Sequence, residues 1–130
     1  MIAVDTNVLV RLVTNDDPKQ SREAAGLFAR EDVFVAKSVL LESEWVLRAA
    51  YGLSTAAIRG AFERLLSVAS VTVESTPEVA RAMTWYAAGM DFADALHLAC
   101  SSTASSFVSF DRKFVRRAQK LDTVPPASSP

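Results

Sequence analysis

Four acidic residues stand where an ordinary surface role does not explain them. Asp5 follows the apolar run MIAV and Asp111 follows FVSF, whereas Glu42 and Asp94 lie within segments of helical periodicity. A carboxylate beside a core is costly unless it is paired or coordinated. Carboxylates gathered in one place raise each other's pKa values, and a cation relieves this repulsion. Oxygen donors without a histidine or cysteine cluster suit Mg²⁺ or Mn²⁺. Such ions serve in-line attack of water on a phosphodiester, so the pattern indicates a nuclease.

Helix geometry favours Glu42 over Glu44 as the functional acid of its segment. Residues 38–50 are expected to form a helix, on which Glu42 shares a side with apolar residues such as Val39. Glu44 has Arg48 four residues further on, which is the favourable order for a helical ion pair. We therefore expect Glu42 to lie on an apolar face without a local partner, and Glu44 to form an ordinary ion pair.

The other acids have a simpler explanation as helix caps. Asp5 and Asp111 each precede a helical pattern, where a carboxylate satisfies free backbone N–H groups. Asp91 and Asp94 resemble a capping pair, with one residue at the cap and one in the first turn. Capping and metal binding can coexist in one side chain. His97 is expected to be a structural histidine near the site, and Cys100 a small core residue.

The elements that position these residues alternate along the chain. Strands are expected at residues 1–5, 33–36, 70–74 and 107–110, with a short edge strand at 121–124. The expected helices begin at Thr6, Asp17, Ser38, Ser54 or Thr55, Pro77, Asp91 and Asp111. This alternation predicts an α/β fold, a three-layer α/β/α sandwich with a central, mainly parallel sheet. Ligands bind at the carboxyl edge of such sheets, so Asp5 and Asp111 are expected at one edge. We expect a single domain over residues 1–124 and a flexible polar tail over 125–130.

Charge is distributed unevenly, although the net charge is only −1. The segment DRKFVRRAQK places several basic side chains on one helical face; they are Arg112, Lys113, Arg116, Arg117 and Lys120. Arg112, Lys113 and Arg116 are candidates for RNA phosphates, and Arg11 is a weaker one. No apolar stretch is long enough to span a membrane, and no signal peptide is evident. We therefore expect a cytoplasmic protein without a membrane partner.

Four stretches of the chain, in order, resemble the conserved blocks of the PIN-domain ribonucleases, and the VapC toxins of bacterial toxin–antitoxin pairs in particular. The stretches are MIAVDTNVLVRL, VLLESEWVL, DFADALHLA and FVSFDRKF, and the resemblance runs from Met1 to about Lys120. The resemblance assigns the family's acidic quartet, as metal ligands and catalytic residues, to Asp5, Glu42, Asp94 and Asp111. It also matches supporting positions at Thr6, Asn7 and Ser109, with Asp91 as an auxiliary acid.

The resemblance implies an activity and partners that the residues alone do not show. It implies Mg²⁺- or Mn²⁺-dependent endoribonuclease activity on RNA, a homodimer, and a small VapB-like antitoxin that covers the site. Two alternatives stay open at this point. One is a housekeeping PIN nuclease of RNA processing, and the other is a non-catalytic PIN scaffold that binds RNA or protein.

Overall fold

Helices and strands alternate along the chain, as the hydrophobic pattern predicts. The computed structural model describes residues 1–130. The strands are β1 (Ile2–Ala3), β2 (Val33–Val35), β3 (Val71–Val73), β4 (Phe107–Val108) and β5 (Ala127–Ser128). The helices are α1 (Thr6–Val13), α2 (Pro18–Arg30), α3 (Lys37–Ala49), α4 (Thr55–Ser67), α5 (Thr76–Ala87), α6 (Phe92–Ala99) and α7 (Arg112–Lys120). They fall into two compact units, Met1–Thr76 and Pro77–Pro130.

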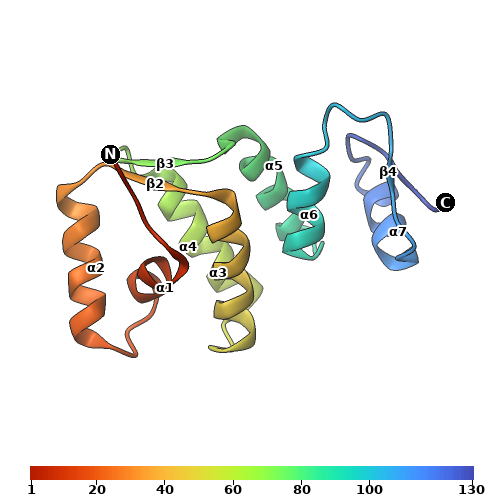
Figure 1. Cartoon of the computed structure of the whole chain (residues 1–130). Helices are drawn as coiled ribbons and strands as arrows, with labels where there is room; N and C mark the ends of the chain where they lie inside the picture. The colour runs from red at the N-terminus through yellow and green to blue at the C-terminus, as the bar shows by residue number, and fades with distance from the viewer. The chain divides into compact units, whose positions relative to one another are not determined.

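The first unit is built on a parallel sheet with strand order β1-β2-β3, of which β2 and β3 are labelled in Figure 1. Ile2 lies opposite Val33, which lies opposite Val71 on the other side. A helix pair follows each of the first two strands, and α1 packs against both α2 and α3. The β-branched residues Val33 and Val35 are fully buried, as a central strand covered by helices requires. The carboxyl ends of β1 and β2 therefore lead directly into α1 and α3.

The second unit holds α5, α6, α7 and a two-stranded parallel sheet of β4 and β5. Phe107 lies opposite Ala127 in this pair. Its core includes an edge-to-face contact between Phe107 and Phe114, with ring centroids 5.5 Å apart. Phe92 of α6 is fully buried in the same unit. The packing of Phe114 fixes the start of α7 against β4.

The α/β class with parallel strand pairing is confirmed, with differences in detail. The five strands form two sheets, so β1 and β4 belong to different sheets rather than to one central sheet. The prediction of an edge strand at residues 121–124 was wrong, because this segment forms turns. The strand instead lies at 127–128, within the segment expected as a flexible tail. Its pairing uses backbone bonds, such as Phe107 N–H to Pro126 O at 2.9 Å, which need no apolar pattern.

Most predicted helix starts are confirmed by their side-chain caps. The N-caps with a side-chain hydrogen bond are Asp5, Asp17, Ser54, Asp91 and Asp111. The prediction that Ser38 caps α3 was wrong. The helix begins at Lys37, and its N-cap residue, Ala36, makes no side-chain cap bond. The backbone N–H of Lys37 donates instead to Glu74 Oε1 at 3.0 Å. None of the helices combines the length and the apolar character that a membrane crossing needs.

Candidate active site

Asp5 occupies the junction between β1 and α1, and one of its carboxylate oxygens accepts a hydrogen bond from the helix. The backbone N–H of Val8 donates to Asp5 Oδ1 at 3.1 Å, which caps the helix. Asp5 Oδ2 accepts no hydrogen bond from the chain, and the side chain is exposed. Val4, directly before it, is buried beside the sheet. The cap therefore orients the carboxylate and leaves one oxygen for a ligand.

The helical-face prediction for α3 was wrong in one respect. Glu44, and not Glu42, is the buried acid, with 2% of its surface exposed. The core-facing stripe of α3 consists of Leu40, Ser43, Glu44 and Leu47, so Glu42 lies off it and is exposed. Glu44 does form the predicted ion pair, with Arg48 Nε 2.9 Å from Glu44 Oε2. The ion pair neutralises the buried carboxylate, which a low-dielectric site requires.

Glu42 is nevertheless held in place from α1. The hydroxyl of Thr6, a buried side chain, donates a hydrogen bond to Glu42 Oε1. Thr6 directly follows Asp5, so this bond links the start of α1 to the second turn of α3. Glu42 is thereby tied to the residue next to Asp5 in the chain, within the first unit. A hydrogen bond to one carboxylate oxygen fixes the orientation of the other.

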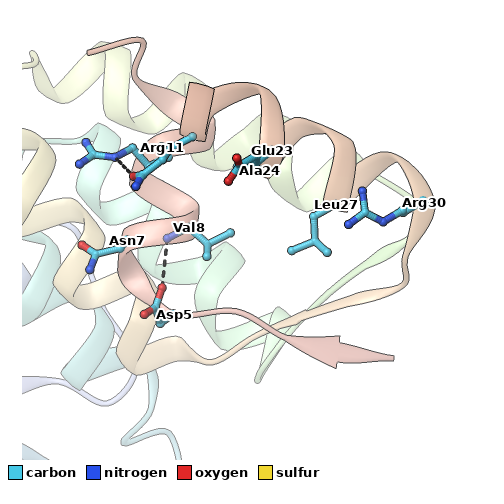
Figure 2. A pocket seen from close by; sticks show the side chains of 9 residues that line it. Asp5, Asn7, Val8, Arg11, Glu23, Ala24, Leu27 and Arg30 are labelled. Atoms are coloured by element: carbon cyan, nitrogen blue, oxygen red, sulfur yellow. Dashed lines mark hydrogen bonds between the residues drawn. The ribbon is translucent and has the colours of Figure 1, made fainter. Parts of the chain in front are cut away.

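A pocket lies beside Asp5, between α1 and α2 (Figure 2). Its volume is about 610 Å³. It is lined by Asp5, Asn7, Val8 and Arg11 from α1 and its cap, and by Gln20, Glu23, Ala24, Leu27 and Arg30 from α2. Val8 and Leu27 point into the space between the helices, and Arg30 stands at the far end of α2. The pocket therefore combines an apolar floor with polar side chains beside Asp5.

Arg11, the weaker RNA candidate, already has several partners within the first unit. Its guanidinium donates to Asp16 Oδ1 at 2.9 Å, to Gln20 Oε1 at 2.8 Å and to the Tyr51 hydroxyl at 2.9 Å. These bonds connect the last turn of α1 to the first turn of α2 and to Tyr51, which follows α3. A phosphate would have to compete with them, so the geometry gives Arg11 a structural role.

Three acids of the second unit influence one another. Asp91 caps α6, because its Oδ2 accepts from the backbone N–H of Asp94 at 3.2 Å. Burial raises the pKa of Asp94, and the negative charges of Asp91 and Asp111 raise this pKa further. His97 acts in the opposite direction. The second unit therefore contains a patch of concentrated negative charge around a partly buried carboxylate.

Two local hydrogen bonds fix Asp111 at the start of α7. Its Oδ1 accepts from the backbone N–H of Phe114 at 3.1 Å, and its own backbone N–H donates to Ser109 Oγ at 3.0 Å. Ser109, predicted as a supporting residue, thus shapes the turn before the helix. The basic helix follows, with Arg112, Lys113 and Arg116 exposed to solvent. The predicted cationic surface is therefore present beside Asp111.

Two predictions for residues around α6 and α7 need correction or refinement. Cys100 is exposed at the end of α6, so its prediction as a core residue was wrong. The helix ends at Ala99, which places Cys100 beyond the buried stripe. Arg117 is partly covered, because its Nη1 donates to the carbonyl oxygen of Ala88 at 2.8 Å. Arg117 therefore supports the turn after α5 rather than the cationic surface.

The donor set fits a hard divalent cation in its chemistry. The candidate ligands are carboxylates, and like-charge repulsion within the second unit is the condition that a cation relieves. No group of three or more histidine, cysteine, aspartate or glutamate side chains is placed so as to hold an ion. Of the predicted acids, Asp5 and Glu42 belong to the first unit, and Asp94 and Asp111 belong to the second.

A comparison with protein-family models matches residues 2–120 to the PIN domain. The chain belongs to the PIN-domain family. No curated protein matches it. PIN domains are generally nucleases, so this PIN domain has a fold associated with hydrolysis of nucleic acids.

One further acid of this PIN domain, Glu74, could have been found from the sequence. Glu74 directly follows β3, and its Oε1 accepts a hydrogen bond from the backbone N–H of Lys37, the first residue of α3. The signal was present in the stretch SVTVE, where a strand pattern ends on a carboxylate. Glu74 thereby positions the helix that carries Glu42.

Proposed function

We propose that this PIN domain is a Mg²⁺- or Mn²⁺-dependent endoribonuclease and the toxin of a VapBC-type pair in the cytoplasm. The observation that carries the proposal is the acidic group Asp91, Asp94 and Asp111, in which burial raises the pKa of Asp94 and the charges of Asp91 and Asp111 raise it further. A divalent cation is the simplest partner for such a group. The family match and the four resembling blocks support a nuclease reaction at these acids.

The proposed ligands are those that the family resemblance assigns, namely Asp5 and Glu42 of the first unit and Asp94 and Asp111 of the second. When bound, the ion would lower the pKa of a water molecule and neutralise negative charge on the phosphate. The chain's own residues orient the ligands. The N–H of Val8 fixes one oxygen of Asp5, and the Thr6 hydroxyl fixes Glu42.

The phosphate backbone of the RNA needs cationic partners beside these acids. Arg112 and Lys113 follow Asp111 directly and are exposed, and Arg116 lies one turn further along α7. Contacts from such side chains position the backbone without reading its sequence. They would place a phosphodiester beside the carboxylates.

The toxin role rests on the resemblance to VapC proteins and includes a homodimer and a small VapB-like antitoxin. An apolar groove of about 280 Å³ in the first unit supports an apolar protein partner. Leu9, Leu12 and Val13 of α1 line it together with Phe28 and Leu65. Expression of the chain should arrest growth, and expression of the Asp5→Asn variant at the same level should not. Growth that continues at full expression would contradict the toxin role.

Cleavage of end-labelled single-stranded RNA by the purified chain tests the nuclease. Wild type should cut with Mg²⁺ or Mn²⁺, leave 5′-phosphate ends, and stop cutting in EDTA. Asp5→Asn should lose activity although asparagine still caps a helix. Asp17→Asn is a matched control, because Asp17 caps α2 through the same bond, at 3.1 Å from the N–H of Gln20. Equal cleavage by Asp5→Asn and wild type would refute the site, and RNA binding without cleavage would favour a scaffold.

A further inference from the structure

Phe110 is the most exposed of the large apolar side chains, with 87% of its surface accessible. Phe110 stands two residues beyond β4, at a bend before α7. Phe107 turns inward and packs against Phe114, whereas Val108 and Phe110 turn outward. Val108 is itself 58% exposed, so this short segment carries two exposed apolar side chains, Val108 and Phe110, which make up a small apolar strip. An aromatic ring left in water in this way gains nothing from burial in the folded chain.

The backbone on both sides of Phe110 is held by hydrogen bonds. The N–H of Ser109 donates to the carbonyl oxygen of Ser128 at 3.0 Å, which extends the pairing with β5. The N–H of Asp111 donates to Ser109 Oγ at 3.0 Å, and the carboxylate of Asp111 caps α7. The exposed ring therefore stands on a fixed turn, and a ligand that stacks on it need not order the backbone first.

The charges next to Phe110 distinguish between partners. Arg112 and Lys113 follow within three residues, and both are exposed. A protein partner would favour a wider apolar surface, whereas a flat aromatic ring beside cations matches single-stranded nucleic acid. Bases stack on the ring and phosphates pair with the basic side chains.

From this arrangement we infer that Phe110 is a stacking platform for one base of the RNA substrate and positions the adjoining phosphodiester beside Asp111. The inference rests on the proposed ribonuclease function and adds a positioning residue to it. Every base has a π-face that can stack on the phenyl ring, so Phe110 would hold the strand without selecting a sequence. Register along the strand would then be set by the distance between the stacked base and the carboxylates.

RNA binding in EDTA, followed by fluorescence anisotropy of a labelled single-stranded RNA, isolates this contact from cleavage. Phe110→Ala and Phe110→Leu should both weaken binding, by about 5- to 150-fold, because leucine keeps the apolar volume but loses the ring. Phe110→Trp should retain binding, and its added fluorescence should be quenched when RNA binds. Val108→Ala is the matched control on the same exposed strip and should bind as wild type does.

Different results separate this inference from the proposed function. If wild type cleaves RNA but Phe110→Leu binds it equally well, the stacking role is refuted and the nuclease stands. If Phe110→Ala breaks a dimer in sedimentation while RNA binding is unchanged, the strip is a contact between copies of the chain. If wild type neither binds nor cleaves RNA, both proposals fail.

Discussion

Replacement of Thr6 by valine tests how Glu42 is held. Valine has nearly the shape of threonine but lacks the hydroxyl that donates to Glu42. A hydrogen bond to a charged group contributes about 1.5–3 kcal/mol. Glu42 is exposed, so water compensates in part, and we expect the lower end of this range, about 1.5 kcal/mol. With a urea slope of about 2 kcal/mol per M, the unfolding midpoint should fall by about 0.7 M.

Urea denaturation followed by circular dichroism measures this loss, and Thr6→Ser is the control that keeps the hydroxyl. A double-mutant cycle with Glu42→Ala should give a coupling energy of about 1 kcal/mol or more, because the residues are in direct contact. Loss of the orienting bond should also weaken Mn²⁺ binding by about 10-fold or more. Additive effects of the two substitutions would refute the reasoning, since the hydroxyl would then act elsewhere.

Three further substitutions test individual features of the two units by urea denaturation. The hydrogen bond from the Tyr51 hydroxyl is the main cause of the lowered pKa of Asp16. The stabilisation that the ionised Asp16 carboxylate contributes is therefore complete above the ordinary carboxyl pKa of about 4, and it is lost as the pH falls through the lowered pKa. Asp16→Asn should therefore be less stable than wild type at pH 7, with the difference shrinking below about pH 4; a constant difference would contradict this. Gly89→Ala should cost about 1–2 kcal/mol, because φ is +100° and the added Cβ would stand 2.5 Å from Nη1 of Arg117; unchanged stability would show that the turn relaxes. Ser43→Ala should leave stability equal or raise it by up to about 1 kcal/mol, because its buried hydroxyl has no hydrogen-bond partner; a clear loss would reveal a partner.

The parts of the fold with local causes could be predicted from the sequence. Asp5 and Asp111 cap the helices that follow them, because a carboxylate before an apolar period satisfies N–H groups a few residues away. The α/β class followed from the alternation of strand and helix patterns, and the basic face of α7 from its spacing. Each of these signals lies within one turn or one strand of the residues that it determines.

The failures share a dependence on contacts that are distant in sequence. Ser38 had the right residue type for a cap, but Glu74 reaches α3 from the end of another strand. Glu42 and Glu44 exchanged their expected exposures because apolar residues lie on more than one side of α3, and packing against neighbouring elements chose between them. The strand at Ala127–Ser128 forms through backbone pairing with β4, which leaves no mark in side-chain pattern.

The central claim is that the carboxylates bind a divalent cation, and a calorimetric titration with Mn²⁺ tests it most directly. Wild type should bind Mn²⁺ saturably, and Asp94→Asn should weaken binding by at least about 10-fold, because it removes one of the proposed ligands. Asp17→Asn, a cap outside the proposed ligand set, should bind as wild type does. Saturable binding that depends on Asp94 and not on Asp17 would support the account. Binding that is absent, or that is the same in all three proteins, would contradict it.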